Sequence, residues 1–177
     1  LITGANGYLG YLIFDRLKKK KLDLLGLVRK KNKNSYLFVD FSDENLDLSF
    51  LDKFPIHTII HLVSLNQNVA QKNEVKANKV TINGTSKILQ FARKKNVKKF
   101  IYFSTCQVYG KNLKGIVTES TKPLPFKNYS SLHLKAEKIC IKYSKYFQNG
   151  TFILRLSNII GNPERKNKKF WRLVSND

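Results

Sequence analysis

The 177-residue sequence predicts an α/β fold in which helices cover both faces of a doubly wound parallel sheet. Two observations support this prediction. Along the whole chain, short apolar segments alternate with longer segments whose apolar residues recur at helical spacing. A glycine-rich run, TGANGYLG at residues 3–10, also stands between the first apolar pair and the first helical pattern. Such a run is typical of the strand-to-helix turn that opens a sheet of this class.

The expected elements follow in chain order. Strands are expected at residues 1–3, 24–28, 36–39, 58–62, 100–104 and 152–155, and helices at residues 9–19, 44–51, 74–95 and 130–146. Residues 111–126 contain glycine and prolines and are expected to form a surface loop. Open parallel sheets bind ligands beyond the carboxyl ends of their strands, so a groove is expected along that edge.

Composition limits the class of protein. With 42% hydrophobic residues the chain is expected to form one globular domain. No apolar run approaches the roughly 18 residues of a membrane span, and no secretory leader is evident, so we expect a cytoplasmic protein without a membrane partner. The two cysteines, Cys106 and Cys140, are too few for a disulfide framework. Because the chain lacks methionine and begins inside the first expected strand, we expect it to be part of a longer protein.

The formal net charge of +21 raises the question of a nucleic-acid partner. The lysines are scattered, and their short clusters fall at expected helix ends or in loops. No nucleic-acid-binding motif accompanies them. A solvated basic surface is the favoured interpretation, and a polyanion-binding module is the least favoured function.

The glycine-rich run indicates a Rossmann-type dinucleotide site. Its glycines allow a tight turn, a close approach of the backbone to a pyrophosphate, and close packing of the next helix on the sheet. The start of that helix offers free N–H groups and the positive end of its dipole to the phosphates. The expected cofactor-binding residues of this turn are Gly4, Asn6, Gly7, Tyr8, Leu9 and Gly10.

Arg29 bears on the choice of dinucleotide. Dinucleotide-binding units usually place an acidic residue roughly 20 residues beyond the glycines, where it binds the adenosine ribose. This chain has Arg29 there, followed by Lys30 and Lys31. A guanidinium can bind a 2′-phosphate through two hydrogen bonds, so NADP is slightly favoured over NAD. The alternative is that Arg29 lies in solvent at a strand end.

The histidines do not indicate a metal centre. His57 and His61 have no further histidine or cysteine at ligand spacing, so no metal is expected. His61, at the end of an expected strand, is interpreted as a hydrogen-bonded core residue rather than a catalyst.

Seven motifs carry a family resemblance. They are TGxxGxxG at the amino terminus, Asp40, HLVS from His61, the helix with Asn83, FSTxxVYG ending at Gly110, a helix led by Tyr129 and including Glu137, and LRLSNIIG from Leu154. In this order they are similar to those of the extended short-chain dehydrogenases/reductases, and the chain is identified as a member of the NAD-dependent epimerase/dehydratase family. The resemblance implies an NAD(P)-binding domain at residues 1–160. Residues 161–177 would begin a smaller C-terminal substrate domain that is mostly missing.

The resemblance also implies function. It suggests an epimerase or keto-reductase that acts on a nucleotide-linked sugar by hydride transfer, and a homodimer formed through the helices at 74–95 and 130–146. Besides the glycine turn and Arg29, the implied cofactor-binding residues are Asp40, Phe41, Leu62, Val63, Ser64, Asn83, Tyr129 and His133. The implied substrate-binding residues are Thr105, Cys106, Gln107 and Asn158. Tyr129 would be the acid/base, with Thr105 and His133 as the other catalytic residues.

Two positions depart from the family pattern. His133 stands one helical turn after Tyr129, where the family has a lysine that stabilises the tyrosinate. A histidine, with a reference pKa of about 6.5, is mostly neutral at pH 7. Either it acts in the lysine's place, which is favoured, or the chain is a catalytically impaired sensor or scaffold. Cys106 and Gln107 replace the Asp-Glu pair of related 4,6-dehydratases and supply no acid/base pair for the loss of water, so dehydration is disfavoured.

Overall fold

The computed structural model describes residues 1–29, 36–111 and 115–159 of the chain. The sheet comprises β1 (Ile2–Thr3), β2 (Gly26–Val28), β3 (Tyr36–Phe38), β4 (Thr58–His61), β5 (Lys99–Thr105) and β6 (Thr151–Leu156). All neighbouring strands are parallel, in the order β3-β2-β1-β4-β5-β6. The order reverses between β1 and β4, which confirms the predicted doubly wound Rossmann-type sheet.

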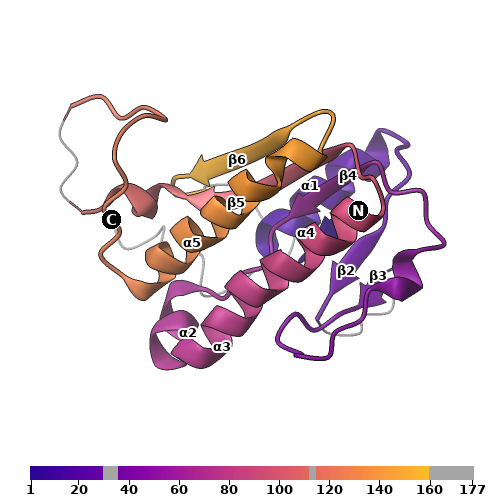
Figure 1. The fold of residues 1–177 in the computed structure, drawn as a ribbon, viewed down its shortest axis with the longest axis horizontal. Coiled ribbons are helices and arrows are strands. Elements are labelled where there is room, and N and C mark those ends of the chain that lie inside the picture. The colour runs from indigo at the N-terminus through magenta and orange to yellow at the C-terminus, as the bar shows by residue number, and fades with distance from the viewer. Residues whose placement is uncertain (30–35, 112–114, 160–177) are drawn as a thin grey trace.

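The helices lie in two layers. They are α1 (Tyr8–Lys19), α2 (Gln67–Lys72), α3 (Glu74–Asn78), α4 (Gly84–Lys94) and α5 (Asn128–Tyr143). Figure 1 shows α4 and α5 side by side across one face of the sheet, with α1 behind it. The prediction of helices on both faces is therefore confirmed.

Each layer has its own hydrophobic core. Behind the sheet, Phe14 of α1 packs with Ile2 and Val28. On the opposite face, Leu89 of α4 and Ala136 of α5 belong to a larger buried cluster that includes the strand residues Leu27, Ile59 and Phe100. Burial of apolar surface on both sides explains why the inner strands are apolar almost throughout.

The predicted helix at 44–51 is wrong. Only its last residues form a helical turn, the 3-10 turn Ser49–Leu51. The Asp43 carboxylate accepts a hydrogen bond from the backbone N–H of Asn45 at 2.9 Å, and the Asp47 carboxylate accepts one from the N–H of Ser49 at the same distance. These local bonds satisfy the backbone in tight turns, and so they compete with the helix.

The predicted helix at 74–95 is interrupted. It consists of α3, a π-helical turn (Lys79–Asn83) and α4. Before it lies α2, which was not expected. Asn66 caps α2 by accepting a hydrogen bond from the Val69 N–H, and Asn73 caps α3 by accepting one from the Lys76 N–H, both at 2.9 Å. The asparagine caps fix where α2 and α3 begin, whereas the π-helical turn between α3 and α4 has no side-chain cap.

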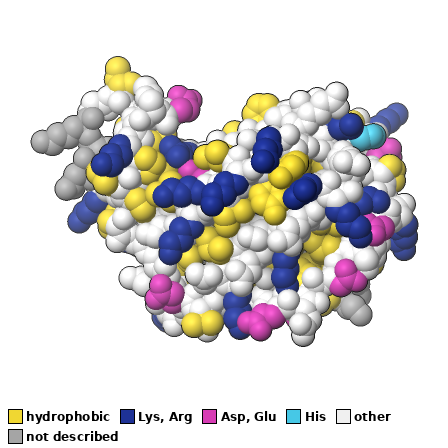
Figure 2. All heavy atoms as spheres, viewed as in Figure 1, with side chains coloured by type: hydrophobic (Ala, Val, Ile, Leu, Met, Phe, Trp, Pro, Cys, Tyr) yellow, Lys and Arg dark blue, Asp and Glu magenta, His cyan; other side chains and the backbone are white. Residues whose placement is uncertain are grey.

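The remaining expectations concern the surface. Residues 115–126 contain no helix or strand, as predicted, and the segment projects away from the sheet (Figure 1). Lysine and arginine side chains are spread over much of the face in Figure 2, interspersed with apolar ones. Within the described ranges, no helix has the length and apolarity needed to cross a bilayer. The expectations for Lys30, Lys31 and residues 161–177 lie outside the described residues.

Candidate functional site

The glycine turn after β1 requires its glycines. Gly4 has a φ of +69°, a conformation that disfavours side chains, and its carbonyl accepts a hydrogen bond from the Gly7 N–H at 2.9 Å. A Cβ on Gly10 would lie 2.1 Å from the Gly4 carbonyl oxygen. Any side chain at Gly10 would therefore force α1 away from the strand.

The start of α1 is suited to an anion. Its first turn holds no acidic residue, and its N-cap, Gly7, offers no side-chain hydrogen bond to the helix. The first N–H groups of a helix lack intrahelical partners and form the positive end of its dipole. Such helix starts bind anions, and the pyrophosphate site stays a prediction.

Two cavities meet at this turn. One, of about 770 Å³, runs past the ends of β2, β3 and β4 and is lined by Arg29, Asp40 and Phe41 among others. A second, of about 240 Å³, lies toward β5 and is lined by Thr105, Tyr129 and His133. Both are also lined by Gly4, Gly7, Tyr8, Leu62, Ser64 and Tyr129. Together they form the groove expected at the carboxyl edge, which we call the switch-point groove.

Most predicted cofactor residues line this groove. Asn6 and Val63 line the larger cavity, and Leu9 and Gly10 the smaller one. Asn83 is an exception, because it lies in the π-helical turn and lines a separate cavity of about 300 Å³. The sequence predicted Asn83 as a cofactor-binding residue, whereas the structure places it outside the groove.

Tyr129 lies where the two cavities join, in the first turn of α5. The Ser130 hydroxyl donates to the Lys127 carbonyl at 2.9 Å and accepts from the Lys127 N–H at 3.3 Å, which holds this turn in place. Burial raises the pKa of Tyr129 above its usual value, and a hydrogen bond with Ser64 offsets part of that rise. The phenol is therefore protonated at neutral pH.

His133 lies one turn further along α5 and is 2% exposed. Its ring meets the Tyr129 ring edge to face, with centroids 4.6 Å apart. Nδ1 is hydrogen-bonded to the Tyr102 hydroxyl at 2.9 Å, whereas Nε2 has no partner among the described residues. Burial lowers the pKa of His133 to about 4, so the imidazole is neutral at pH 7, as predicted.

Thr105 ends β5 at the smaller cavity. Its hydroxyl accepts a hydrogen bond from the Gln107 N–H at 3.2 Å and caps the 3-10 turn Cys106–Tyr109. The residue is 7% exposed and lines the smaller cavity. Ser104 and Phe103 line the same cavity.

The other predicted substrate residues lie apart from this centre. Cys106 lines a distinct groove of about 630 Å³ beside β6. The Gln107 side-chain oxygen is buried and has no hydrogen-bond partner among the described residues. Asn158 is exposed, and its neighbours Ser157 and Ile159, rather than Asn158 itself, line the smaller cavity.

His61 is a core residue, as expected. It is fully buried and hydrogen-bonded to the hydroxyls of Thr3 at 2.7 Å and Thr85 at 3.2 Å. Burial lowers the pKa of His61 to about 3. Over the described parts of the chain, no group of three or more His, Cys, Asp or Glu side chains is placed to hold a metal ion.

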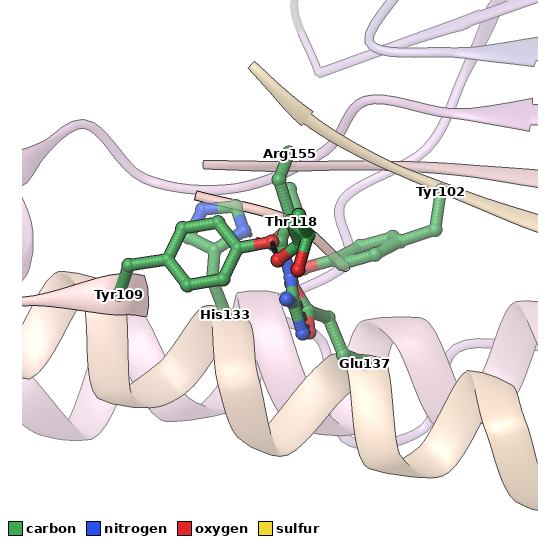
Figure 3. A network of polar contacts seen from close by, with 7 residues as sticks. Tyr102, Tyr109, Thr118, His133, Glu137 and Arg155 are labelled. Carbon is green, nitrogen blue, oxygen red and sulfur yellow. Dashed lines mark hydrogen bonds and ion pairs between the residues drawn. The ribbon is translucent and has the colours of Figure 1, made fainter. Parts of the chain in front are cut away.

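A buried ion pair anchors α5, and the sequence assigned it no role. The Glu137 carboxylate is bound by Arg155 of β6 at 2.7 Å and by the Ser104 hydroxyl of β5 at 2.5 Å. The Arg155 guanidinium lies over the Tyr109 ring, 4.7 Å from its centroid, and the Tyr109 hydroxyl donates to the Thr118 carbonyl. Figure 3 shows these residues as one network. It ties the helix that carries Tyr129 to two strands and to the loop.

The sheet order and the switch-point groove define a Rossmann-type fold. The family described as "NAD dependent epimerase/dehydratase family" matches residues 1–176. The chain belongs to this family, as the sequence resemblance indicated.

The relatives include sugar-nucleotide enzymes. The chain is 28% identical to the "Uncharacterized UDP-glucose epimerase YtcB" of Bacillus subtilis, with 98% of this chain and 60% of the relative covered. It is 29% identical to a dTDP-D-glucose 4,6-dehydratase of Dictyostelium discoideum, covering 100% of this chain and 48% of that one. The chain thus spans about half to three-fifths of the length of these relatives.

Solved structures share the fold. A UDP-glucuronic acid 4-epimerase from Bacillus cereus, in complex with UDP-glucuronic acid and NAD, is 27% identical with a TM-score of 0.78, covering 98% of this chain and 60% of that one. MoeE5 in complex with UDP-glucose and NAD matches with a TM-score of 0.83 at 21% identity, covering 98% of this chain and 58% of that chain, which shows the fold alone.

Proposed function

We propose that this chain is the cofactor-binding part of an NAD(P)-dependent epimerase or keto-reductase that acts on a nucleotide-linked sugar. One observation carries the proposal: Thr105, Tyr129 and His133 line the same cavity as the glycine turn. A dinucleotide with its pyrophosphate on the turn could therefore reach these three side chains. The relatives named as UDP-sugar epimerases support the substrate class.

The larger cavity fits the adenosine half of a dinucleotide. We assign Asp40 and Phe41 to the adenosine, and residues 62–64 to the middle of the molecule. Burial alone would raise the pKa of Asp40, but hydrogen bonds from Ser42 and the charge of Arg29 outweigh it and lower the pKa. The carboxylate is therefore ionised and able to accept hydrogen bonds from hydroxyls.

The identity of the dinucleotide depends on Arg29. Its position on the larger cavity suits a 2′-phosphate, whereas the ionised Asp40 in the same cavity repels one. The epimerase from Bacillus cereus was solved with NAD, and the relatives named above give no support to a preference for NADP. That preference stays a prediction, and the ratio of the dissociation constants for NADH and NADPH tests it.

The proposed chemistry is a proton transfer at Tyr129 coupled to hydride transfer. The bound nicotinamide would supply or accept the hydride. In the reducing direction, the protonated Tyr129 donates to the developing sugar alkoxide while Thr105 binds the same oxygen. In the oxidising direction, Tyr129 must first lose its proton, which its raised pKa disfavours at neutral pH. Oxidation is therefore expected to accelerate as the pH rises.

Epimerisation or keto-reduction fits better than dehydration. Loss of water from the sugar needs an acid and a base close to the reacting carbons. Cys106 lines a different groove, and Gln107 does not titrate and has a buried side-chain oxygen. This arrangement supports a reaction that uses Tyr129, Thr105 and the dinucleotide alone.

A second candidate function is binding without turnover, as a sensor or scaffold. Two observations favour it: His133 is neutral, and the pKa of Tyr129 is raised rather than lowered. The protein itself therefore supplies no fixed positive charge at position 133 to stabilise a tyrosinate.

Equilibrium binding and turnover separate these functions. The full-length protein is titrated with NADH and NADPH, and turnover of a panel of nucleotide sugars is then measured. Net reduction or oxidation is followed by nicotinamide absorbance, and epimerisation, which regenerates the nicotinamide, is followed by chromatography of the sugar products. Turnover that Tyr129→Phe abolishes and Tyr143→Phe retains supports the enzyme, because Tyr143 lies at the far end of the same helix. Tight binding without hydride exchange on any sugar would support the sensor, and absence of binding would overturn both.

We also propose the homodimer that the family resemblance implies, formed through the outer faces of α4 and α5. The outer face of α5 exposes Ile141 between Lys138 and Lys142. An apolar contact of this kind would join two lysine-rich faces, so its strength would depend on salt.

A further inference from the structure

The imidazole of His133 has one nitrogen without a partner among the described residues. Nδ1 is occupied by the Tyr102 hydroxyl, and Nε2 is buried without a partner among the described residues. His133 is one of the residues that line the smaller cavity, so Nε2 is the ring nitrogen left for a ligand there. Whether Nε2 donates or accepts depends on which nitrogen carries the single proton of the neutral ring.

Hydrogen-bond accounting distinguishes the two tautomers. If Nδ1 carried the proton and donated to Tyr102, the buried Tyr102 O–H would have no described acceptor, and the Nε2 lone pair would also be unmatched. If Tyr102 donates to Nδ1, only the N–H at Nε2 is left unmatched. Buried polar groups without partners are costly, so the second arrangement is preferred.

The surroundings of Tyr102 keep the proton on its phenol oxygen. The side chain is 1% exposed within β5. Burial, with the nearby Cys140, Glu137 and Tyr129 in support, raises the pKa of Tyr102 well above its usual value. The phenol therefore retains its proton. Figure 3 shows Tyr102 reaching across from its strand toward the helix that carries His133 and Glu137.

We propose that Tyr102 is a positioning residue that sets the tautomer of His133, so that this chain presents an uncharged Nε2–H donor to the cofactor in the switch-point groove. A directed N–H group can donate to a ribose hydroxyl or to the Tyr129 oxygen, both of which accept. It thus supplies a hydrogen bond where the family has a charged lysine, without the lysine's positive charge. The link to the cofactor rests on the proposed function, whereas the tautomer assignment does not.

The tautomer can be measured without cofactor or substrate. Long-range proton–nitrogen correlation spectra of the 15N-labelled full-length protein show which ring nitrogen of each histidine bears the proton. The His133 signals are identified by their absence in His133→Gln. We expect the proton on Nε2 in the wild type. A proton on Nδ1 would overturn the proposal, whatever the protein's activity.

Two variants test the role of Tyr102. In Tyr102→Phe, which lacks the donor to Nδ1, we expect a signal from protonated Nδ1 and dinucleotide binding weaker by up to about tenfold, the scale of one hydrogen bond. The matched Tyr143→Phe variant, which removes a phenol hydroxyl from the far end of α5, should leave the His133 signals unchanged. Identical His133 signals in Tyr102→Phe and wild type would show that Tyr102 does not set the tautomer.

If Tyr102→Phe does not fold, the wild-type spectrum still decides the tautomer. Addition of NAD⁺ to the wild type should then shift the His133 Nε2–H signal. An unchanged signal on saturation with NAD⁺ would overturn the contact with the cofactor. Failure of NAD⁺ to bind would instead overturn the proposed function and leave the tautomer assignment intact.

Discussion

The buried pair between Glu137 and Arg155 predicts an asymmetric response to mutation. The Glu137 side chain is 1% exposed, whereas that of Arg155 is 20% exposed. Removing Arg155 leaves a carboxylate deep in the protein, with the Ser104 hydroxyl as its one remaining hydrogen-bond partner among the described residues. Removing Glu137 leaves a guanidinium that can still reach water and the Tyr109 ring. Arg155→Met should therefore cost more stability than Glu137→Gln.

The magnitudes follow from the desolvation of each partner. Breaking a buried ion pair by removing one partner costs about 3 to 5 kcal/mol, and we expect Arg155→Met to fall in this range. For Glu137→Gln we expect about 2 kcal/mol, since the neutral amide still accepts hydrogen bonds. The double variant should be more stable than Arg155→Met alone, because the buried charge is then absent.

Urea unfolding of the full-length protein at pH 7, followed by circular dichroism, measures these differences. Lys138→Met is a suitable control, because Lys138 directly follows Glu137 on α5 and is exposed. Its effect should stay within about 0.5 kcal/mol. If Glu137→Gln destabilised as much as Arg155→Met, or if the double variant were the least stable, the reasoning from burial would be refuted.

Three further predictions concern the turn, the histidines and the dimer. Gly10→Ala should abolish NADH binding as measured by nucleotide fluorescence, because its Cβ would lie 2.1 Å from the Gly4 oxygen. Gly115→Ala has open space for its Cβ, and although its φ of +73° strains any side chain, it should retain binding. Unfolded histidines titrate at about 6.5, whereas burial lowers the pKa of His61 to about 3 and that of His133 to about 4. The unfolded state therefore binds more protons, and the free energy of unfolding should fall as the pH drops from about 6.5 toward 4, by up to about 1.4 kcal/mol per pH unit for each histidine. His133→Gln should roughly halve that slope in urea titrations, and an unchanged slope would contradict the assignment. In sedimentation experiments the dimer through α4 and α5 should strengthen between about 50 and 500 mM salt, because screening weakens lysine repulsion; Ile141→Asp should dissociate it, and a dimer insensitive to both changes must use another face.

Strong local patterns in the sequence were sufficient to predict the strands and the long helices. The glycine turn and the apolar strands lie where the sequence predicted them, because steric limits at Gly4 and Gly10 and burial on both faces act over short stretches. The segments at 44–51 and 66–78 differ because their asparagines and aspartates bond to nearby backbone groups. The spacing of apolar residues along the sequence does not reveal that competition.

By itself the sequence determined the class of fold, the dinucleotide turn and the set of hydroxyl residues that could act on a substrate. Only the tertiary structure decided how they are arranged. It brings Thr105, Tyr129 and His133 to one cavity, places Asn83 and Cys106 in others, and joins residues distant in the chain, such as Tyr102 to His133 and Glu137 to Arg155. The physical reason is that steric and periodic constraints act between neighbours in the chain. Burial, tautomer and ionisation depend on contacts that exist only after the sheet and helices have packed together.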